Sequence, residues 1–131
     1  MQSLAGTMWR VVGARSVDKD GHELLPFGAR PIGFAIFEAE RMLVAIGEGR
    51  VTQQPNAPPR VFVAYTGTYR FDGRELVTVP DDASRPELIV EQVRHLRFES
   101  STRMVAVPVS GLPSQHGIEI AWERVDPAAN G

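Results

Sequence analysis

The most constraining feature of this sequence is a two-residue alternation of apolar and polar side chains that recurs along almost its whole length. Such alternation places successive side chains on opposite faces of a β-strand, whereas a helix needs a period near 3.6 residues. A helical period holds only in EAERMLVAIGEG (38–49), which lies between β-rich runs and ends in glycines. The 12 glycines and 10 prolines suit many short strands joined by turns. The sequence therefore predicts an all-β protein.

About eight antiparallel strands are expected between the turn signals, which include DKDG at 18–21 and the Asp72-Gly73 pair. Loops rich in proline or glycine are predicted at 22–31, 53–59 and 80–86. A sheet of this size without covering helices must close into a barrel or fold into a sandwich. Short sequential hairpins favour an up-and-down barrel, whose interior can hold side chains or one small ligand. The predicted strands are 8–17, 32–37, 42–47, 60–71, 75–79, 87–98, 103–109 and 117–125.

Length and charge narrow the class of protein. A chain of 131 residues suits one domain over 1–131, needs no metal or disulfide to hold a core, and has no cysteine. A net charge of −2 leaves no basic surplus for nucleic acid. Neither a signal peptide nor a membrane-spanning stretch is visible, so we expect a cytoplasmic protein without a membrane partner.

The alternation also predicts which side chains point inward. In the last strand Ile118, Ile120 and Trp122 share one face, and Glu119 and Glu123 share the other. The apolar face is expected to meet the core.

The run 60–71 is expected to turn Tyr65 and Tyr69 inward, together with Val61, Val63 and Phe71. Gly67, between the two tyrosines, indicates a bend or a close backbone approach. Phe62 is placed on the outer face.

Two polar side chains, Gln92 and Arg94, fall on the same strand face as Leu96 and Phe98. One interpretation is a bulge near Val93 that changes the register, or an arginine at a barrel mouth with its head in water. The other is that both project into an internal cavity. An isolated cation there would be costly, so it would need acceptors, a carboxylate or water.

Several motifs in order resemble the small bacterial lipocalin-like domain family. They are PFG at 26–28, PIGF at 31–34, AYTGTY at 64–69 and WERV at 122–125, and the resemblance runs from about residue 4 to residue 125. It implies a calycin-type antiparallel barrel with a central ligand cavity.

The resemblance also implies that Trp9, on the first strand, packs under Arg124, on the last, and closes one barrel end. Met8 is an additional residue between the usual glycine and this tryptophan, which leaves the register there open. The segment after LVTV lacks the histidine-bearing polar strand of relatives, so no activity that depends on that strand is carried over.

No catalytic or metal-binding motif stands out. His22, His95 and His116 are scattered without a second ligand at metal-binding spacing, so we expect solvated histidines and no metal. Phosphate-cradling and dinucleotide motifs are absent, and no cofactor is expected. Asp81 and Asp82 are neighbours on a predicted loop and are expected to be solvated.

Three functional hypotheses remain open. The favoured one is binding of a small hydrophobic or amphipathic ligand in the barrel. The alternative is a cyclase or isomerase acting on a hydrophobic intermediate, with Tyr65, Tyr69 or Arg94 stabilising an oxyanion. A homodimer through an outer apolar strip at Phe62 is the third. The apolar segment 24–27 could cover the barrel mouth or pack outside. The candidate ligand-binding residues are Tyr65, Tyr69, Gln92, Arg94, Phe98 and Trp122.

Overall fold

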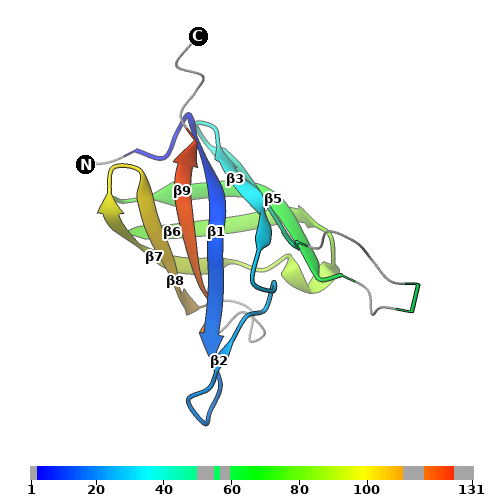
Figure 1. The fold of residues 1–131 in the computed structure, drawn as a ribbon. Coiled ribbons are helices and arrows are strands. Elements are labelled where there is room, and N and C mark those ends of the chain that lie inside the picture. Colours follow the sequence, from blue (N-terminus) through cyan, green and yellow to red (C-terminus); the bar gives the residue numbers. More distant parts are fainter. Residues whose placement is uncertain (1–2, 50–54, 57–59, 111–116, 126–131) are drawn as a thin grey trace.

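The chain forms a closed antiparallel β-barrel (Figure 1). The computed structural model describes residues 3–49, 55–56, 60–110 and 117–125. Its elements are β1 (Thr7–Val17), β2 (Glu23–Leu24), β3 (Pro31–Phe37), β4 (Arg41–Glu48), β5 (Phe62–Phe71), β6 (Glu75–Ala83), the 3-10 turn η1 (Pro86–Leu88), β7 (Gln92–Ser100), β8 (Arg103–Ser110) and β9 (Glu119–Val125).

The barrel has eight strands with up-and-down connectivity, as predicted. From β3 to β9 each strand pairs with the next, β1 pairs with β3, and β9 returns to β1. The two-residue β2 forms only a hairpin with the end of β1, within the segment that was predicted as a loop. No helix in the described part of the chain is long and apolar enough to cross a membrane.

The segment after Val79 was predicted as a loop, but β6 continues through it to Ala83. A bulge makes this possible, because Pro80 pairs with Gly67 and Asp82 already pairs with Thr66. A Cβ atom on Gly67 would lie 2.1 Å from the carbonyl oxygen of Val79. Glycine therefore lets the two backbones approach at the position where proline interrupts the ladder.

The strand predicted over 87–98 begins only at Gln92, so its first part is corrected. Pro86 starts a 3-10 turn, for which its fixed φ is suited. Alternation over 87–98 would place Leu88 and Val90 on the same inner face as Gln92. Leu88 does reach the interior from this turn, whereas Val90 is exposed.

The first strand has its bulge at Val12 rather than at Met8. Met8 pairs in register with Val125, and the register with β9 shifts between Val11 and Gly13. The bulge keeps Trp9 and Val11 buried on one side of it and Ala14 buried on the other.

The barrel end where β1 begins and β9 ends is packed with aromatic side chains. The ring of Phe98 lies 6.2 Å from that of Trp9 and 6.2 Å from that of Phe71. The indole Nε1 of Trp9 donates a hydrogen bond to the Thr7 hydroxyl (2.8 Å), which donates to the Leu4 carbonyl oxygen (2.6 Å). We call this group of five residues the closed end.

Arg124 lies directly opposite Trp9 in the β1–β9 ladder. Its Nε atom is buried and makes no hydrogen bond within the described residues. Packing of the guanidinium against an aromatic face would suit such an atom. The stacking that the family resemblance implies stays a prediction.

Candidate functional site

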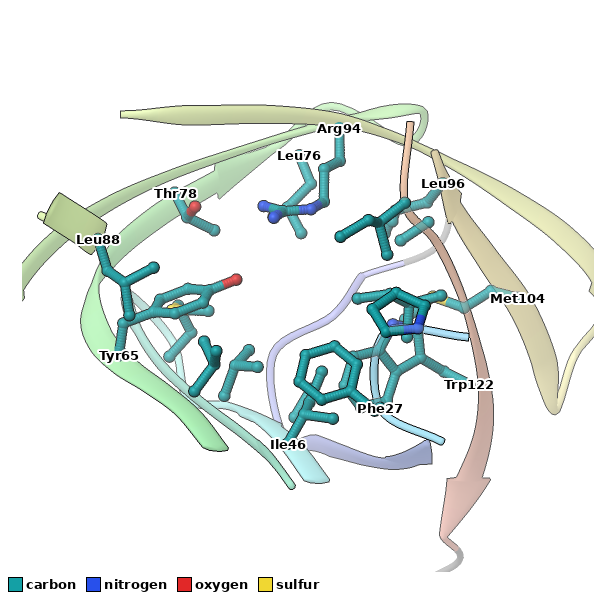
Figure 2. Close-up of a pocket in the computed structure, with 18 of the residues that line it drawn as sticks. Phe27, Ile46, Tyr65, Leu76, Thr78, Leu88, Arg94, Leu96, Met104 and Trp122 are labelled. Carbon is teal, nitrogen blue, oxygen red and sulfur yellow. The ribbon is translucent and has the colours of Figure 1, made fainter. Parts of the chain in front are cut away.

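The interior is hollow on the side away from the closed end. A cavity of about 160 Å³ lies among the strands, and its wall is mostly hydrocarbon (Figure 2). Contributing side chains include Phe27, Ile46, Leu76, Leu88, Met104 and Trp122. The side chains predicted to point inward from the last strand, Ile118, Ile120 and Trp122, all line it.

Strand alternation builds the wall between β4 and β5. Val44 faces Tyr65 across the ladder, and Ile46 faces Val63. All four are buried and line the cavity. Such cross-strand pairs on an inner face are the unit of packing in a sheet.

Three polar side chains converge on one part of the wall, which we call the polar corner. Tyr65, Thr78 and Arg94 line the cavity, and Figure 2 shows their polar ends pointing toward one another. Thr78 is 1% exposed and Arg94 is 9% exposed. Because Thr78 pairs with Gln92 across the β6–β7 ladder, these two side chains share the inner face.

Gln92 and Arg94 project inward from β7, and the nearby bulge lies on the neighbouring strand β8. The register between β7 and β8 shifts between Val93 and Arg94, and the extra residue is Val109 on β8. Strand β7 itself keeps its alternation, so Gln92 and Arg94 are both buried on the inner side.

Two buried polar atoms at this corner have no hydrogen-bond partner among the described residues. They are the hydroxyl of Thr78 and the side-chain carbonyl oxygen of Gln92. The other end of the Gln92 amide donates to the Leu88 carbonyl oxygen at 3.4 Å. An unsatisfied buried polar group costs about 1–3 kcal/mol. A hydroxyl in this state, facing a cavity, is available to a ligand.

The charged side chains along the cavity have one sign. Among the described lining residues these are Arg85 and Arg94, and no carboxylate is present. Arg85 lies exposed and forms an ion pair with Glu87 at 3.5 Å. Arg94 is engaged within the chain. The cavity is thus an apolar chamber with a cationic side.

The two halves of the apolar segment 24–27 lie in different surroundings. Leu24 and Leu25 are exposed, whereas Phe27 is buried and lines the cavity with Pro26. Gly28 has a φ of +76° and donates its N–H to the Leu25 carbonyl oxygen, which makes the turn that directs the Phe27 ring inward. The second half of the segment therefore covers the barrel mouth, and the first half lies outside.

The candidate ligand-binding residues fall into three groups. Tyr65, Arg94 and Trp122 line the cavity. Phe98 belongs to the closed end, and Tyr69 packs against Phe37, which pairs with Thr7 of that end. The Tyr69 hydroxyl donates to the Glu38 carbonyl oxygen at 2.6 Å, and partial burial raises the tyrosine's pKa.

Gln92 is buried on the inner side but is not among the lining residues. The sequence pattern placed Leu88 on the inner face and left open whether Phe27 covers the barrel mouth, whereas Thr78 was not predicted as a cavity residue. The alternation in ELVTV, which puts Leu76 and Thr78 on one face, could have identified the threonine.

The described histidine side chains and the acidic residues near them lie outside the cavity, and their contacts stabilise turns and strand pairs. His95 lies on the outer side of β7, 3.5 Å from Glu75. One candidate metal-binding group, at Asp18, Asp20 and His22, is exposed. The Asp18 carboxylate there accepts the backbone N–H groups of Asp20 and His22, which accounts for the turn. His116 lies outside the described residues.

Asp81 is exposed but paired. Both of its carboxylate oxygens accept hydrogen bonds of 2.9 Å from Arg41. This pairing lowers the pKa of Asp81 and raises that of Arg41. Asp82 accepts the backbone N–H of Ala83 at 2.9 Å. Neither carboxylate lines the cavity.

Exposed apolar side chains gather on the outer face of β3, β4 and β5. Phe62 is 56% exposed there, and a shallow groove beside it is lined by Ile32, Phe34 and Leu43. The homodimer suggested by the sequence would use this surface and stays a prediction.

Comparison with known families and proteins gives one match. The lipocalin-like domain matches residues 6–125, which include the residues that line the cavity and all of the closed end except Leu4. No curated protein and no solved structure matches the chain. The match spans nearly all of the barrel that the strands build, so the chain belongs to the lipocalin-like domain family.

Proposed function

We propose that this protein binds one small hydrophobic or amphipathic molecule inside its barrel, without covalent chemistry. The observation that carries the proposal is the cavity of about 160 Å³ and its mostly hydrocarbon wall. Close-packed protein interiors hold few voids larger than a water molecule. In another protein an apolar cavity of roughly 150 Å³ stays dry and binds benzene. The expected occupant is therefore about as large as a substituted aromatic ring or a short hydrocarbon chain.

The mouth of the cavity supports this proposal, because the residue that covers it belongs to no strand of the barrel. Phe27 lies in the segment between β2 and β3, so moving its ring breaks no hydrogen bond of the barrel ladder. Membership of the lipocalin-like domain family supports ligand binding in general terms and names no ligand.

A neutral two-ring compound, indole, is a probe of matching size and tests the proposal by isothermal titration calorimetry. We expect indole to bind, and other small aromatic compounds to compete with it. The variant Ala106→Leu adds hydrocarbon inside the cavity and should weaken the probe at least about tenfold, because the same space cannot hold both. The matched control is Ala121→Leu, since Ala121 pairs with Val105 on the outward-facing side of the adjacent strand.

Two results would contradict the proposal. One is that neither the probe nor any small apolar compound binds or raises the melting temperature. The other is binding that Ala106→Leu leaves unchanged while Ala121→Leu abolishes it, which would locate the site on the outside of the barrel.

A further inference from the structure

We infer that the ligand is a small amphipathic monoanion whose carboxylate head lies at the polar corner and whose apolar body lies against Phe27 and Trp122. The inference rests on the proposed function, since it names the chemical class of the molecule in that same cavity. It follows from the charge, the hydroxyl groups and the shape of the wall.

Charge is the first reason. Both charged lining residues in the described part of the chain are cations, and no carboxylate lines the cavity. Arg85 is exposed and pairs with Glu87, so the buried charge is that of Arg94, which is 9% exposed. Taking a cation out of water costs free energy, and an anion placed beside it recovers part of that cost. Arg94 is engaged within the chain, but a guanidinium carries five N–H donors and can serve more than one acceptor. A cationic ligand would meet repulsion instead.

The unpartnered hydroxyl is the second reason. Thr78 is 1% exposed, lines the cavity, and makes no hydrogen bond through its side chain within the described residues. The hydroxyl of Tyr65 points into the same corner (Figure 2). Two hydroxyl donors and a guanidinium suit a group with two acceptor oxygens, because hydrogen bonds to an ionised acceptor are about twice as strong as neutral ones. The carbonyl of Gln92, an acceptor, is not part of the lining.

The shape of the wall is the third reason. Tyr65, Thr78 and Arg94 come from β5, β6 and β7, and the wall facing them is made of hydrocarbon and aromatic side chains (Figure 2). One polar side in an otherwise apolar chamber orients a molecule that has one polar end. A cavity of about 160 Å³ must also hold the apolar body, which favours a compact, singly charged head over a phosphate dianion.

Three compounds with one body and different heads test this inference on the unaltered protein. They are 3-phenylpropanoate, 3-phenylpropanol and 3-phenylpropylamine, each titrated against bound indole by calorimetry at neutral pH. We expect the acid to bind at least about tenfold more tightly than the alcohol, and the amine to bind most weakly. Equal affinities for acid and alcohol, with the neutral probe still displaced, would overturn the carboxylate assignment and leave the proposed function standing. Failure of the probe itself to bind would instead contradict the proposed function.

The variant Thr78→Val then tests the hydroxyl with little change in volume. We expect it to weaken 3-phenylpropanoate about five- to tenfold while the neutral probe binds as before. The same substitution at Thr68, which is exposed on β5, is the control and should change neither affinity. An unchanged affinity of Thr78→Val for the acid would remove Thr78 from the head-group site.

Discussion

The closed end and the cavity are built by the same strands, yet one is filled and the other is hollow. Inward-facing positions toward the closed end carry large rings, such as Trp9, Phe71 and Phe98. Inward-facing positions around the cavity include smaller side chains, such as Thr78 and Ala106. Alternation alone decides that a side chain points inward. The volume of that side chain decides whether the barrel is packed at that height.

The two regions also differ in whether their buried hydroxyl groups are hydrogen-bonded. At the closed end Thr7 both donates to Leu4 and accepts from Trp9. In the polar corner the Thr78 hydroxyl has no partner within the described residues. The hydroxyl at the closed end is therefore satisfied by the chain itself, whereas the hydroxyl at the cavity has hydrogen-bonding capacity left for another molecule.

Replacing either of the two tryptophans by alanine should change the free energy of unfolding more than any other proposed substitution. Trp9→Ala should lower the free energy of unfolding by about 3–5 kcal/mol, because the indole is packed and hydrogen-bonded. Trp122→Ala should cost less, since that indole already borders the cavity. Urea denaturation of both variants measures the difference. An equal or larger loss for Trp122→Ala would break the distinction between a packed and a hollow region.

The two threonines should give effects of opposite sign. Thr7→Val removes a hydroxyl that makes two hydrogen bonds, so it should destabilise the protein by about 1–2 kcal/mol. Thr78→Val removes an unpartnered hydroxyl, so it should stabilise the ligand-free protein by about 1 kcal/mol. Thermal and urea unfolding test both variants. If Thr78→Val proves destabilising, its hydroxyl has a partner in solution.

Much of the fold follows from local pattern. Each strand pairs with a near neighbour in sequence, so alternation and turn residues were enough to predict an eight-stranded up-and-down barrel. The exact boundaries of the strands could not be predicted from alternation alone, because they depend on neighbouring strands and on turns. Strand β6 passes Pro80 because Gly67 on β5 has no side chain there, and β7 starts late because Pro86 begins a 3-10 turn.

The contents of the interior were harder to predict. Alternation placed Tyr65, Tyr69 and Phe98 on the inner face, but it carries no information on their height along the barrel axis. Only Tyr65 among these three lines the cavity, because Tyr69 and Phe98 lie nearer the closed end. The hollow itself depends on side chains from many strands together, which no single stretch of sequence displays.

Tyr69, which packs toward the closed end, should make stability depend slightly on pH above about pH 10. Partial burial toward the closed end raises the pKa of Tyr69 above its ordinary value of about 10. The folded state therefore favours the neutral phenol, whose hydroxyl donates to the Glu38 carbonyl oxygen. Its contribution to stability is complete below about pH 10 and is lost as the pH rises through the raised pKa. We expect wild-type stability to fall more steeply above pH 10 than that of Tyr69→Phe, measured by urea denaturation across this range. Parallel pH profiles would mean that the phenol is solvated alike in the folded and unfolded chain, and that the packed region does not extend to Tyr69.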